Sequence, residues 1–369
     1  MLIFLNKAQP GERKTWLICK LLAGTKTTNQ RLTCRREEVM HRVIIFCNSA
    51  SGVPSILIRS TLAALVSRDD LKLVAICIPK PQAFASIFWR HIRERAFFAI
   101  HSLSEPALMR RHTIPVPINL NQWARRFGFR VLIPPEGNIN HPDFIAQLRN
   151  EIRPTIALSF YCLQKFSPDL LEVFRHAVNY HNGLLPAYRG LKATAWSVYH
   201  GEKETGFTFH RMNKELDEGP ILAQGTVPVS PDSGTVDLDL EKAITATNYI
   251  PQVLRMVVGG DPGVPQKDKG KYFAKADYLA VTRIPDPSSL SIAELIRRLR
   301  AFGGLQIRIG DRWHKAAKIR EIRERLRKRS CCCFRTSDGV LVEPVRLRHL
   351  PYALARGWIR KWLSGKVIP

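Results

Sequence analysis

The stretch TIALSFYCLQKFSPDLLEVFRHAVNYH, residues 155–181, predicts a strand, a short helix and a second strand in direct succession. Its first nine residues form an apolar run of the kind found in buried strands. Ser167 precedes the helical segment as its N-cap, and AVNYH follows as a short strand. Because apolar strands joined by helices form parallel sheets, this stretch predicts an α/β fold.

The residues before this stretch repeat the same alternation. RVIIFCNSASGVPSILIRSTLAAL, residues 42–65, predicts a buried strand, a turn of small residues and a helix that begins at about Pro54. Two more strands and a helix bounded by prolines are expected at LKLVAICI, RVLIP and HPDFIAQLRNEIRP, residues 71–78, 130–134 and 141–154. A mostly parallel sheet with crossover helices accounts for these segments.

The chain changes in character near Gly260. Helical and strand patterns continue up to that residue, and a Gly-, Pro- and Lys-rich stretch follows, typical of a linker. One helix, SIAELIRRLRAF, and several short strand-like pieces come after it. The predicted organisation is a basic, poorly ordered extension at 1–39, an α/β domain at 40–260, a linker at 261–280 and a smaller, basic, β-rich and OB-like domain at 281–369.

The chain carries a large positive charge, +26 over 369 residues. This excess indicates attraction to polyanions such as RNA, nucleotides or an anionic membrane surface. Residues 297–369 hold 20 Lys and Arg against 5 Asp and Glu, so this end is the expected contact. The hydrophobic content of 45% excludes disorder as the main state of the chain.

Targeting and redox features point to a cytoplasmic protein. The eight cysteines form no CxxC pair and lack a His at metal-ligand spacing, so we expect reduced thiols and no metal site. No apolar run reaches the roughly 18 residues of a membrane span, and residues 84–100 predict an amphipathic helix. We interpret residues 1–39 as an extended or misassigned start before Met40, with a targeting peptide as the alternative.

Candidate chemistry gathers at the end of the strand AVNYH. Asn179 and His181 are two positions apart, so their side chains share one face at the edge where open α/β sheets bind ligands. Both groups could simply satisfy the backbone of the following turn. Asp217 and Gly219, in a loop after the strand ETGFTFHRM, add a carboxylate at the same edge. A His near a carboxylate and an Asn donor for an oxyanion suit acyl transfer to an amine.

Two long motifs carry a resemblance to a known family. NYHNGLLPAYRG, residues 179–190, resembles the signature N-x-H-x-S-L-L-P-x-Y-R-G of the tetrahydrofolate-dependent formyltransferases. TGFTFHRMNKELDEGPILAQ, residues 205–224, is similar to that family's second signature, TGVTxHxMxxxLDxGxILxQ. The resemblance is strongest over residues 134–229 and extends over residues 40–322.

The resemblance implies a Rossmann-like formyltransferase domain with 10-formyltetrahydrofolate as the donor. Asn179, His181 and Asp217 would be the catalytic residues: His181 assists proton removal from the amine, Asn179 donates to the formyl oxygen and Asp217 supports His181. The segment SFYCLQKF and the loop before Asp217 would cradle the pterin. The folate site would be lined by Gly183, Leu184, Leu185 and Pro186.

One position departs from the signature, because Gly183 stands where Ser is usual. We expect the turn to remain intact, since Gly tolerates any backbone angle, with the loss of one hydrogen bond near the folate. His210 is either a hydrogen-bonded core histidine or a second residue near the acceptor. Its place in TGFTFHRM resembles the formyltransferases of amino sugar nucleotides.

The acceptor is left between two amines. The positive charge favours methionyl-tRNA, because a phosphate backbone attracts Lys and Arg, whereas His210 and SFYCLQKFSP favour an amino sugar nucleotide. We expect methionyl-tRNA as the main acceptor and the sugar nucleotide as the alternative. Hydrolysis of the folate donor is a lesser possibility. A hypothesis of another class is a catalytically retired, nucleic-acid-binding protein on the same scaffold.

Overall fold

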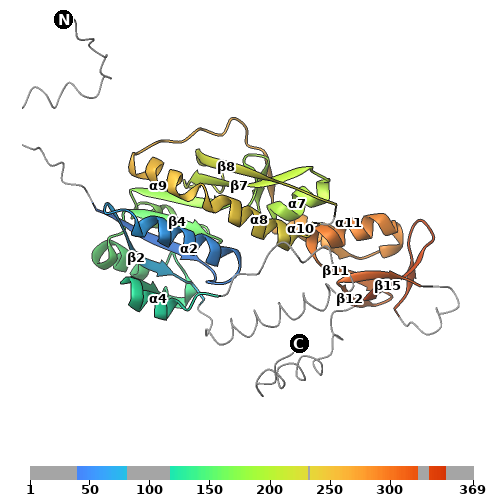
Figure 1. Ribbon diagram of the computed structural model, residues 1–369. Coiled ribbons are helices and arrows are strands. Elements are labelled where there is room, and N and C mark those ends of the chain that lie inside the picture. The colour runs from blue at the N-terminus through green and yellow to red at the C-terminus, as the bar shows by residue number, and fades with distance from the viewer. Residues whose placement is uncertain (1–39, 81–116, 232, 323–331, 346–369) are drawn as a thin grey trace, which may run out of the picture. The chain divides into compact units, whose positions relative to one another are not determined.

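A computed structural model describes residues 40–80, 117–231, 233–322 and 332–345 of the chain (Figure 1). Within these ranges a seven-stranded sheet has the order β3-β2-β1-β4-β5-β7-β8. Its strands are β1 (His41–Cys47), β2 (Leu71–Cys77), β3 (Arg130–Leu132), β4 (Ile156–Phe160), β5 (His176–His181), β7 (Glu204–Arg211) and β8 (Ile221–Pro228). The first five in this order are parallel, and β7 runs antiparallel to both of its neighbours, β5 and β8. The predicted α/β fold with a mostly parallel sheet is confirmed.

The strand order reverses between β1 and β4. The chain moves from β1 to β2 and β3 on one side, then returns to place β4 and β5 on the other. In open α/β sheets, ligand sites lie beyond the carboxyl ends of the strands near such a reversal. The carboxyl end of β5, next to β4, is therefore well placed for a site.

Both faces of the central strands are buried. On β1, Val43 and Ile45 face one apolar cluster, whereas Ile44 and Phe46 face another. The first cluster contains side chains of α2 (Val53–Val66), α8 (Thr235–Thr247) and α9 (Ile250–Val258). The second contains side chains of α5 (Pro142–Gln147), the π-helix Leu148–Ile152 and α6 (Pro168–Leu171). Because β1 is buried on both faces, its sequence is a continuous apolar run rather than an alternating one.

The local signals of the predicted helices hold in most places. Ser167 caps α6 by accepting a hydrogen bond from the backbone N of Leu170 at 3.2 Å. One further helix, α4 (Leu120–Phe127), was not predicted, although Asn119 caps it and Gly128 ends it in the left-handed conformation. The predicted amphipathic helix at 84–100 and the extension at 1–39 lie outside the described residues.

The carboxyl-terminal part is rich in β-structure, as predicted. Its elements are α10 (Lys275–Thr282), β10 (Arg283–Ile284), the 3-10 turn Pro287–Ser289, α11 (Ile292–Phe302), β11 (Leu305–Ile309), β12 (Arg312–Ala316), β13 (Lys318–Glu321), β14 (Phe334–Arg335) and β15 (Leu341–Val345). They form two three-stranded sheets. The chain bends at Ala317, and the strands on either side of it, β12 and β13, belong to different sheets.

The predicted linker is partly structured and contacts the α/β part. Its residues Lys271–Phe273 form β9, which pairs in parallel with β6 (Tyr188–Gly190). The helix α11 packs on α7 (Ala193–His200), where the Tyr199 hydroxyl donates to Glu294 at 2.9 Å. Among the described helices, none is long and apolar enough to cross a membrane.

Candidate active site

Asn179 and His181 lie at the carboxyl end of β5, on one face of the strand. In the pairing with β7, Asn179 is opposite His210 and His181 is opposite Thr208. Tyr180 between them faces the core, where its ring stacks on Phe207 at 5.8 Å. This alternation anchors the strand from one side and leaves the two polar side chains together on the other.

Asp217 reaches the same place from the loop between β7 and β8. Its Oδ1 lies 3.5 Å from Nδ1 of His181 and 3.5 Å from Nε2 of His210. Its Oδ2 accepts a hydrogen bond from the backbone N of Gly190 at 2.9 Å. The carboxylate is 5% exposed, so these contacts are largely shielded from water. The structure thus brings the three predicted side chains, and His210 with them, into one cluster, in which Asn179 is half-buried and the other three are buried.

The backbone around Asp217 explains this approach. Asp217 has a φ of 59°, in the left-handed region that non-glycine residues seldom adopt. Two residues later, a Cβ on Gly219 would lie 1.7 Å from the carbonyl oxygen of Arg211, so only glycine fits there. Glu218 forms an ion pair with the buried Arg189 of the first signature. The sequence DEG therefore ties the second signature to the first.

The hydrogen bonds of His181 define which ring nitrogen is basic. Its Nε2 lies 2.6 Å from the carbonyl oxygen of Tyr188. Since a carbonyl only accepts, Nε2 carries a proton and donates it there. In the neutral ring Nδ1 is then unprotonated, and this atom faces Asp217. His181 is thereby oriented with its basic nitrogen beside a carboxylate.

Burial and neighbouring charges set the protonation states. Burial lowers the pKa of His181 from its ordinary value, an effect that Asp217 and the Tyr188 carbonyl oppose. Burial alone would raise the pKa of Asp217, but the neighbouring imidazoles of His181 and His210 lower it to about 2. At neutral pH the site therefore holds an uncharged imidazole at His181 beside an ionised carboxylate.

His210 connects Asn179 to the carboxylate. Its Nδ1 donates to the carbonyl oxygen of Arg211 at 2.8 Å, so in the neutral ring Nε2 is an acceptor. The amide Nδ2 of Asn179 lies 3.1 Å from that Nε2 and donates to it. This bond orients the Asn179 amide and leaves one of its N–H groups free for another acceptor. His210 is both buried, with 2% exposure, and part of the site.

The segment Gly183–Pro186 is fastened to β7 and β8 through Thr208. The Thr208 hydroxyl donates to the carbonyl oxygen of Gly183 at 2.8 Å and accepts from the N of Leu185 at 3.1 Å. Gln224 on β8 donates to the same hydroxyl at 2.9 Å and to the carbonyl oxygen of Leu185 at 2.8 Å. The peptide bond between Leu185 and Pro186 is cis. The sequence analysis assigned Thr208 no role in the site.

The structure shows why glycine occupies position 183. Its φ is not in the left-handed region, so backbone freedom is not what requires glycine here. A Cβ at this position would meet Cβ of Ala193 at 2.5 Å and Nε2 of His181 at 3.0 Å. Space is therefore the constraint, because α7 and the imidazole both approach the turn closely.

A buried polar network lies behind the turn and was missed from the sequence. Lys242 of α8 is fully buried, and its ammonium donates to the carbonyl oxygen of Asn182 at 3.0 Å and to the hydroxyl of Thr194. Asp239 accepts from Nδ2 of Asn182 at 2.6 Å and lies 3.7 Å from the Lys242 nitrogen. Lys242 follows buried Leu238 by four residues, a spacing that indicates the inner face of a helix.

The segments expected to cradle a pterin carry exposed apolar side chains. Leu163, after β4, is 74% exposed, and Leu216, immediately before Asp217, is 41% exposed. Tyr161 adopts a φ of 58°, and its buried hydroxyl has no hydrogen-bond partner within the described residues. Because these loops flank the end of β5, they offer apolar contact to a flat heterocycle bound there.

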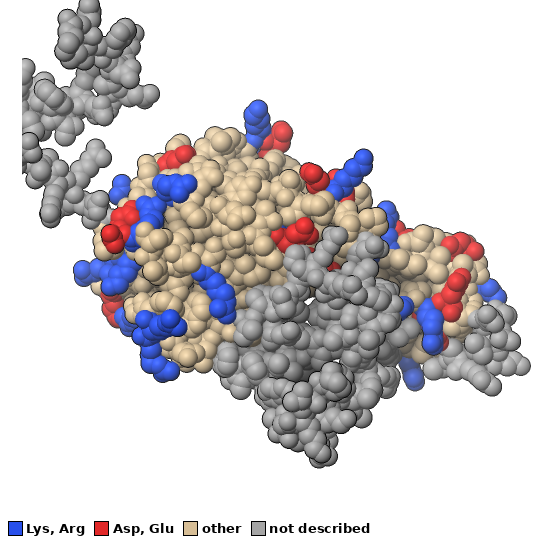
Figure 2. Space-filling view, in the orientation of Figure 1, with Lys and Arg blue, Asp and Glu red and all other residues tan. Residues whose placement is uncertain are grey.

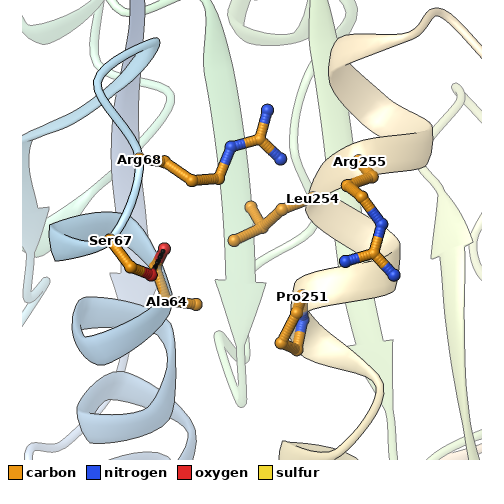
Figure 3. Close-up of a pocket in the computed structure, with 6 residues that line it drawn as sticks. All are labelled: Ala64, Ser67, Arg68, Pro251, Leu254 and Arg255. Carbon is orange, nitrogen blue, oxygen red and sulfur yellow. Dashed lines mark hydrogen bonds between the residues drawn. The ribbon is translucent and has the colours of Figure 1, made fainter.

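A separate surface pocket contains none of these residues. It has a volume of about 380 Å³ and lies between the end of α2 and α9 (Figure 3). In Figure 3 the Arg68 side chain extends toward Leu254, and it is ion-paired with Asp70. The pocket is lined by Ala64, Ser67, Arg68, Pro251, Leu254 and Arg255.

Comparisons with known proteins show which family and which folds this chain resembles. Residues 136–254 match the family described as formyl transferase. A sugar N-formyltransferase from a Shewanella species has 18% identity and a TM-score of 0.52, and the match covers 75% of this chain and 96% of that one. A 4-N formyltransferase from Francisella tularensis has 16% identity and a TM-score of 0.53, covering 76% and 98%.

A third similar structure is an N-formyltransferase from Helicobacter canadensis in complex with folinic acid and dTDP-3-aminofucose. It has 15% identity and a TM-score of 0.51, and the match covers 83% of this chain and 99% of that one. At these identities the structural likeness shows the fold.

The fold and the matched residues define an α/β enzyme of the formyltransferase class. The resemblance to the tetrahydrofolate-dependent formyltransferase family, which the two signatures indicated, is confirmed.

Proposed function

We propose that this enzyme transfers the formyl group of 10-formyltetrahydrofolate to the amino group of a nucleotide-linked amino sugar. The observation that carries the proposal is the buried carboxylate of Asp217, which lies 3.5 Å from both His181 and His210 at the end of β5. Such a cluster supplies a base, a stabilising charge and an oriented amide donor in one place.

His181 acts as the base for the attacking amine. With Nε2 held by the Tyr188 carbonyl, Nδ1 takes the proton that the amine nitrogen loses as it bonds to the formyl carbon. The imidazolium that results is stabilised by Asp217, whose low pKa keeps the carboxylate ionised. The proton on Nδ1 is then available to the departing N10 nitrogen of the folate.

Asn179 stabilises the negative charge that develops on the formyl oxygen. His210 holds one N–H group of the Asn179 amide, and the second donates to that oxygen. One such donor contributes about 3 to 4 kcal/mol to transition-state stabilisation. When the tetrahedral intermediate collapses, the oxygen becomes a carbonyl oxygen again and the bond between the formyl carbon and N10 breaks.

The residues at the end of β5 fit the folate donor. 10-formyltetrahydrofolate would supply an activated formyl group on N10. Leu163 and Leu216, both exposed, would contact the pterin, and the fixed Gly183–Pro186 segment would line the folate site. The N-formyltransferase from Helicobacter canadensis, which carries folinic acid, supports a folate in this fold.

The acceptor is argued from the compared structures and from the distribution of charge. The similar proteins from Shewanella and Helicobacter canadensis are named for sugar substrates or bear dTDP-3-aminofucose, which favours the sugar nucleotide over our expected main acceptor, methionyl-tRNA. The argument for tRNA was the net charge of +26. The ranges outside the described part carry 24 Lys and Arg against 7 Asp and Glu. They therefore hold most of the net positive charge of the chain. On the face drawn in Figure 2, the described residues show basic and acidic side chains interspersed.

The test is a formyl-transfer assay in which three acceptors are tried one at a time. Purified enzyme is incubated with 10-formyltetrahydrofolate and, separately, dTDP-3-aminofucose, a UDP-linked amino sugar, and methionyl-tRNA. We expect a sugar nucleotide to gain the mass of one CO unit. A His181→Gln variant serves as the matched control and should give no product.

Each of the other outcomes would contradict transfer to a sugar nucleotide and indicate a different function. Formylation of methionyl-tRNA alone would move the acceptor to tRNA. Loss of formyl from the donor without a formylated amine would indicate hydrolysis. A chain that neither consumes the donor nor gains thermal stability from folinic acid would refute formyl transfer and favour a retired scaffold.

A further inference from the structure

The residues that follow α9 run along the candidate active site. They contact β8, the Gly183–Pro186 segment and β6 in turn. Val264 and Ile221 exchange two backbone hydrogen bonds of 2.8 Å. A Cβ on Gly270 would lie 1.8 Å from the carbonyl oxygen of Pro186, so the backbone there passes directly over the folate-site segment. β9 then pairs with β6 as far as Gly190. The backbone N of Gly190 donates to Asp217. We call residues 261–273 the strap.

Gln266 is the side chain of the strap that contacts the Asp217 loop. Its Nε2 donates to the carbonyl oxygen of Asp217 at 2.9 Å and to that of Gly219 at 2.8 Å. The two bonds use both N–H groups of the amide and bracket the loop on either side of Glu218. A reversed amide would place an oxygen against two carbonyl oxygens, so the orientation is determined.

The other end of this amide is the acceptor oxygen, Oε1. Oε1 of Gln266 is buried and lacks a hydrogen bond within the described residues. An unsatisfied buried acceptor costs stability. A residue chosen only for stability would avoid that cost, which indicates that the two bonds to the loop serve the site.

Asp217 needs such support because of its own backbone. Its φ of 59° lies in the left-handed region, which is unfavourable for a residue with a side chain. The Gly190 hydrogen bond and the Glu218–Arg189 ion pair hold the side chains of this loop. Without the bonds from Gln266, its backbone would relax toward ordinary angles and carry the carboxylate away from His181. The donation of Gln266 to the Asp217 carbonyl opposes this relaxation at the strained residue itself.

We infer that Gln266 is a positioning residue, which fixes the strained Asp217 loop so that the carboxylate stays beside Nδ1 of His181. This inference rests on the proposed function. It also means that the strap, expected from its sequence to be a linker, is part of the catalytic domain's working structure. Gln266 acts through Asp217 and is not assigned a contact with either substrate.

The experiment compares Gln266→Met and Gln266→Glu with wild type. Met keeps the length of the side chain without N–H donors, and Glu sets a carboxylate against the two carbonyls. The exposed Gln306 of β11 provides the control Gln306→Met. For each protein, kcat is measured against pH, the His181 ring is titrated by NMR with His181→Gln for assignment, and thermal stability is recorded.

We expect kcat to fall at least about tenfold in both Gln266 variants and to remain unchanged in the control. Since Asp217 raises the pKa of His181, its displacement should move the His181 titration and the acid limb of kcat to lower pH. A fall in kcat that merely follows thermal stability, with the His181 titration unmoved, would overturn the inference. So would unchanged kcat and titration. If wild type transfers no formyl group, the proposed function fails, and the NMR titration alone still decides the role of Gln266.

Discussion

Lys242, fully buried in α8, donates a hydrogen bond to the carbonyl oxygen of Asn182 at 3.0 Å. Asn182 directly follows His181, so a positive charge is held next to the turn that carries the base. Burial is the largest cause of the lowered pKa of His181, and the charges of His210 and then of Lys242 lower this pKa further. The arrangement keeps the imidazole neutral and able to accept a proton near neutral pH.

We predict that Lys242→Met moves the acid limb of kcat to higher pH. Burial lowers the pKa of His181 below its ordinary value of 6.5, so wild-type kcat should persist below that pH and fall only as the ring protonates. Removing the Lys242 charge favours the imidazolium and raises that pKa. The measurement is a pH profile of kcat at saturating substrates. An acid limb that stays in place would show that Lys242 does not act on His181.

Lys242 should also make stability depend on alkaline pH. Burial lowers its pKa from 10.5 to about 8, against the opposing effect of Asp239. Between these values the unfolded chain binds more protons than the folded one, so stability rises with pH. The rise is about 3 kcal/mol at most. Urea unfolding of wild type and Lys242→Met across this window should show the additional rise in wild type alone.

Asp217 should contribute stability that is lost in acid. Its pKa of about 2 lies below the value of 3.8 expected in the unfolded chain. The contribution is present above the unfolded value and disappears as pH falls through the folded value. It amounts to about 2 kcal/mol. Asp217→Asn should therefore show a weaker loss of stability than wild type between these two values, measured by urea unfolding. Parallel curves for the two proteins would contradict the lowered pKa.

Much of the site could be predicted because its residues occur in two compact signatures. Asn179 and His181 share a strand face, and the DEG turn has its glycine, Gly219, at a position where no Cβ fits. The fold followed from apolar runs that are buried on both sides, as in β1. Periodicity of side chains was enough for these features.

The residues that were missed act through backbone groups or through space. The bonds of Gln266 to two carbonyl oxygens depend on the path of the strap, which has no periodic pattern to indicate it. The role of Gly183 depends on how closely α7 approaches the turn. Helix α4 was not predicted, although Asn119 and Gly128 mark its ends. These contacts depend on how segments far apart in the sequence approach one another in space.

We predict that Gly183→Ser, which restores the residue usual in the family signature, destabilises this protein. The added Cβ would lie 2.5 Å from Cβ of Ala193 and 3.0 Å from Nε2 of His181. Overpacking of this kind costs about 1 to 3 kcal/mol. The displaced imidazole should also lower kcat. Thermal unfolding and kcat are compared with Gly304→Ser, where the nearest atom to a new Cβ is at 3.6 Å. Full stability and activity in Gly183→Ser would show that α7 can move aside.

Thr208→Val should weaken binding of the folate more than it alters the chemical step. Valine has nearly the same shape, but it removes the hydroxyl that bonds Gly183, Leu185 and Gln224. Because Thr208 is fully buried, the N–H groups of Leu185 and Gln224 lose an acceptor where water cannot replace it, at about 1 to 3 kcal/mol. The segment that lines the proposed folate site would then be less well fixed. Titration of folinic acid by calorimetry should show Kd raised about tenfold or more, because each 1.4 kcal/mol is a factor of ten. His181 keeps its bond to Tyr188 in this variant, so kcat at saturating donor should change less than Kd. A variant with lowered kcat and unchanged Kd would place Thr208 in support of His181 instead of the folate segment.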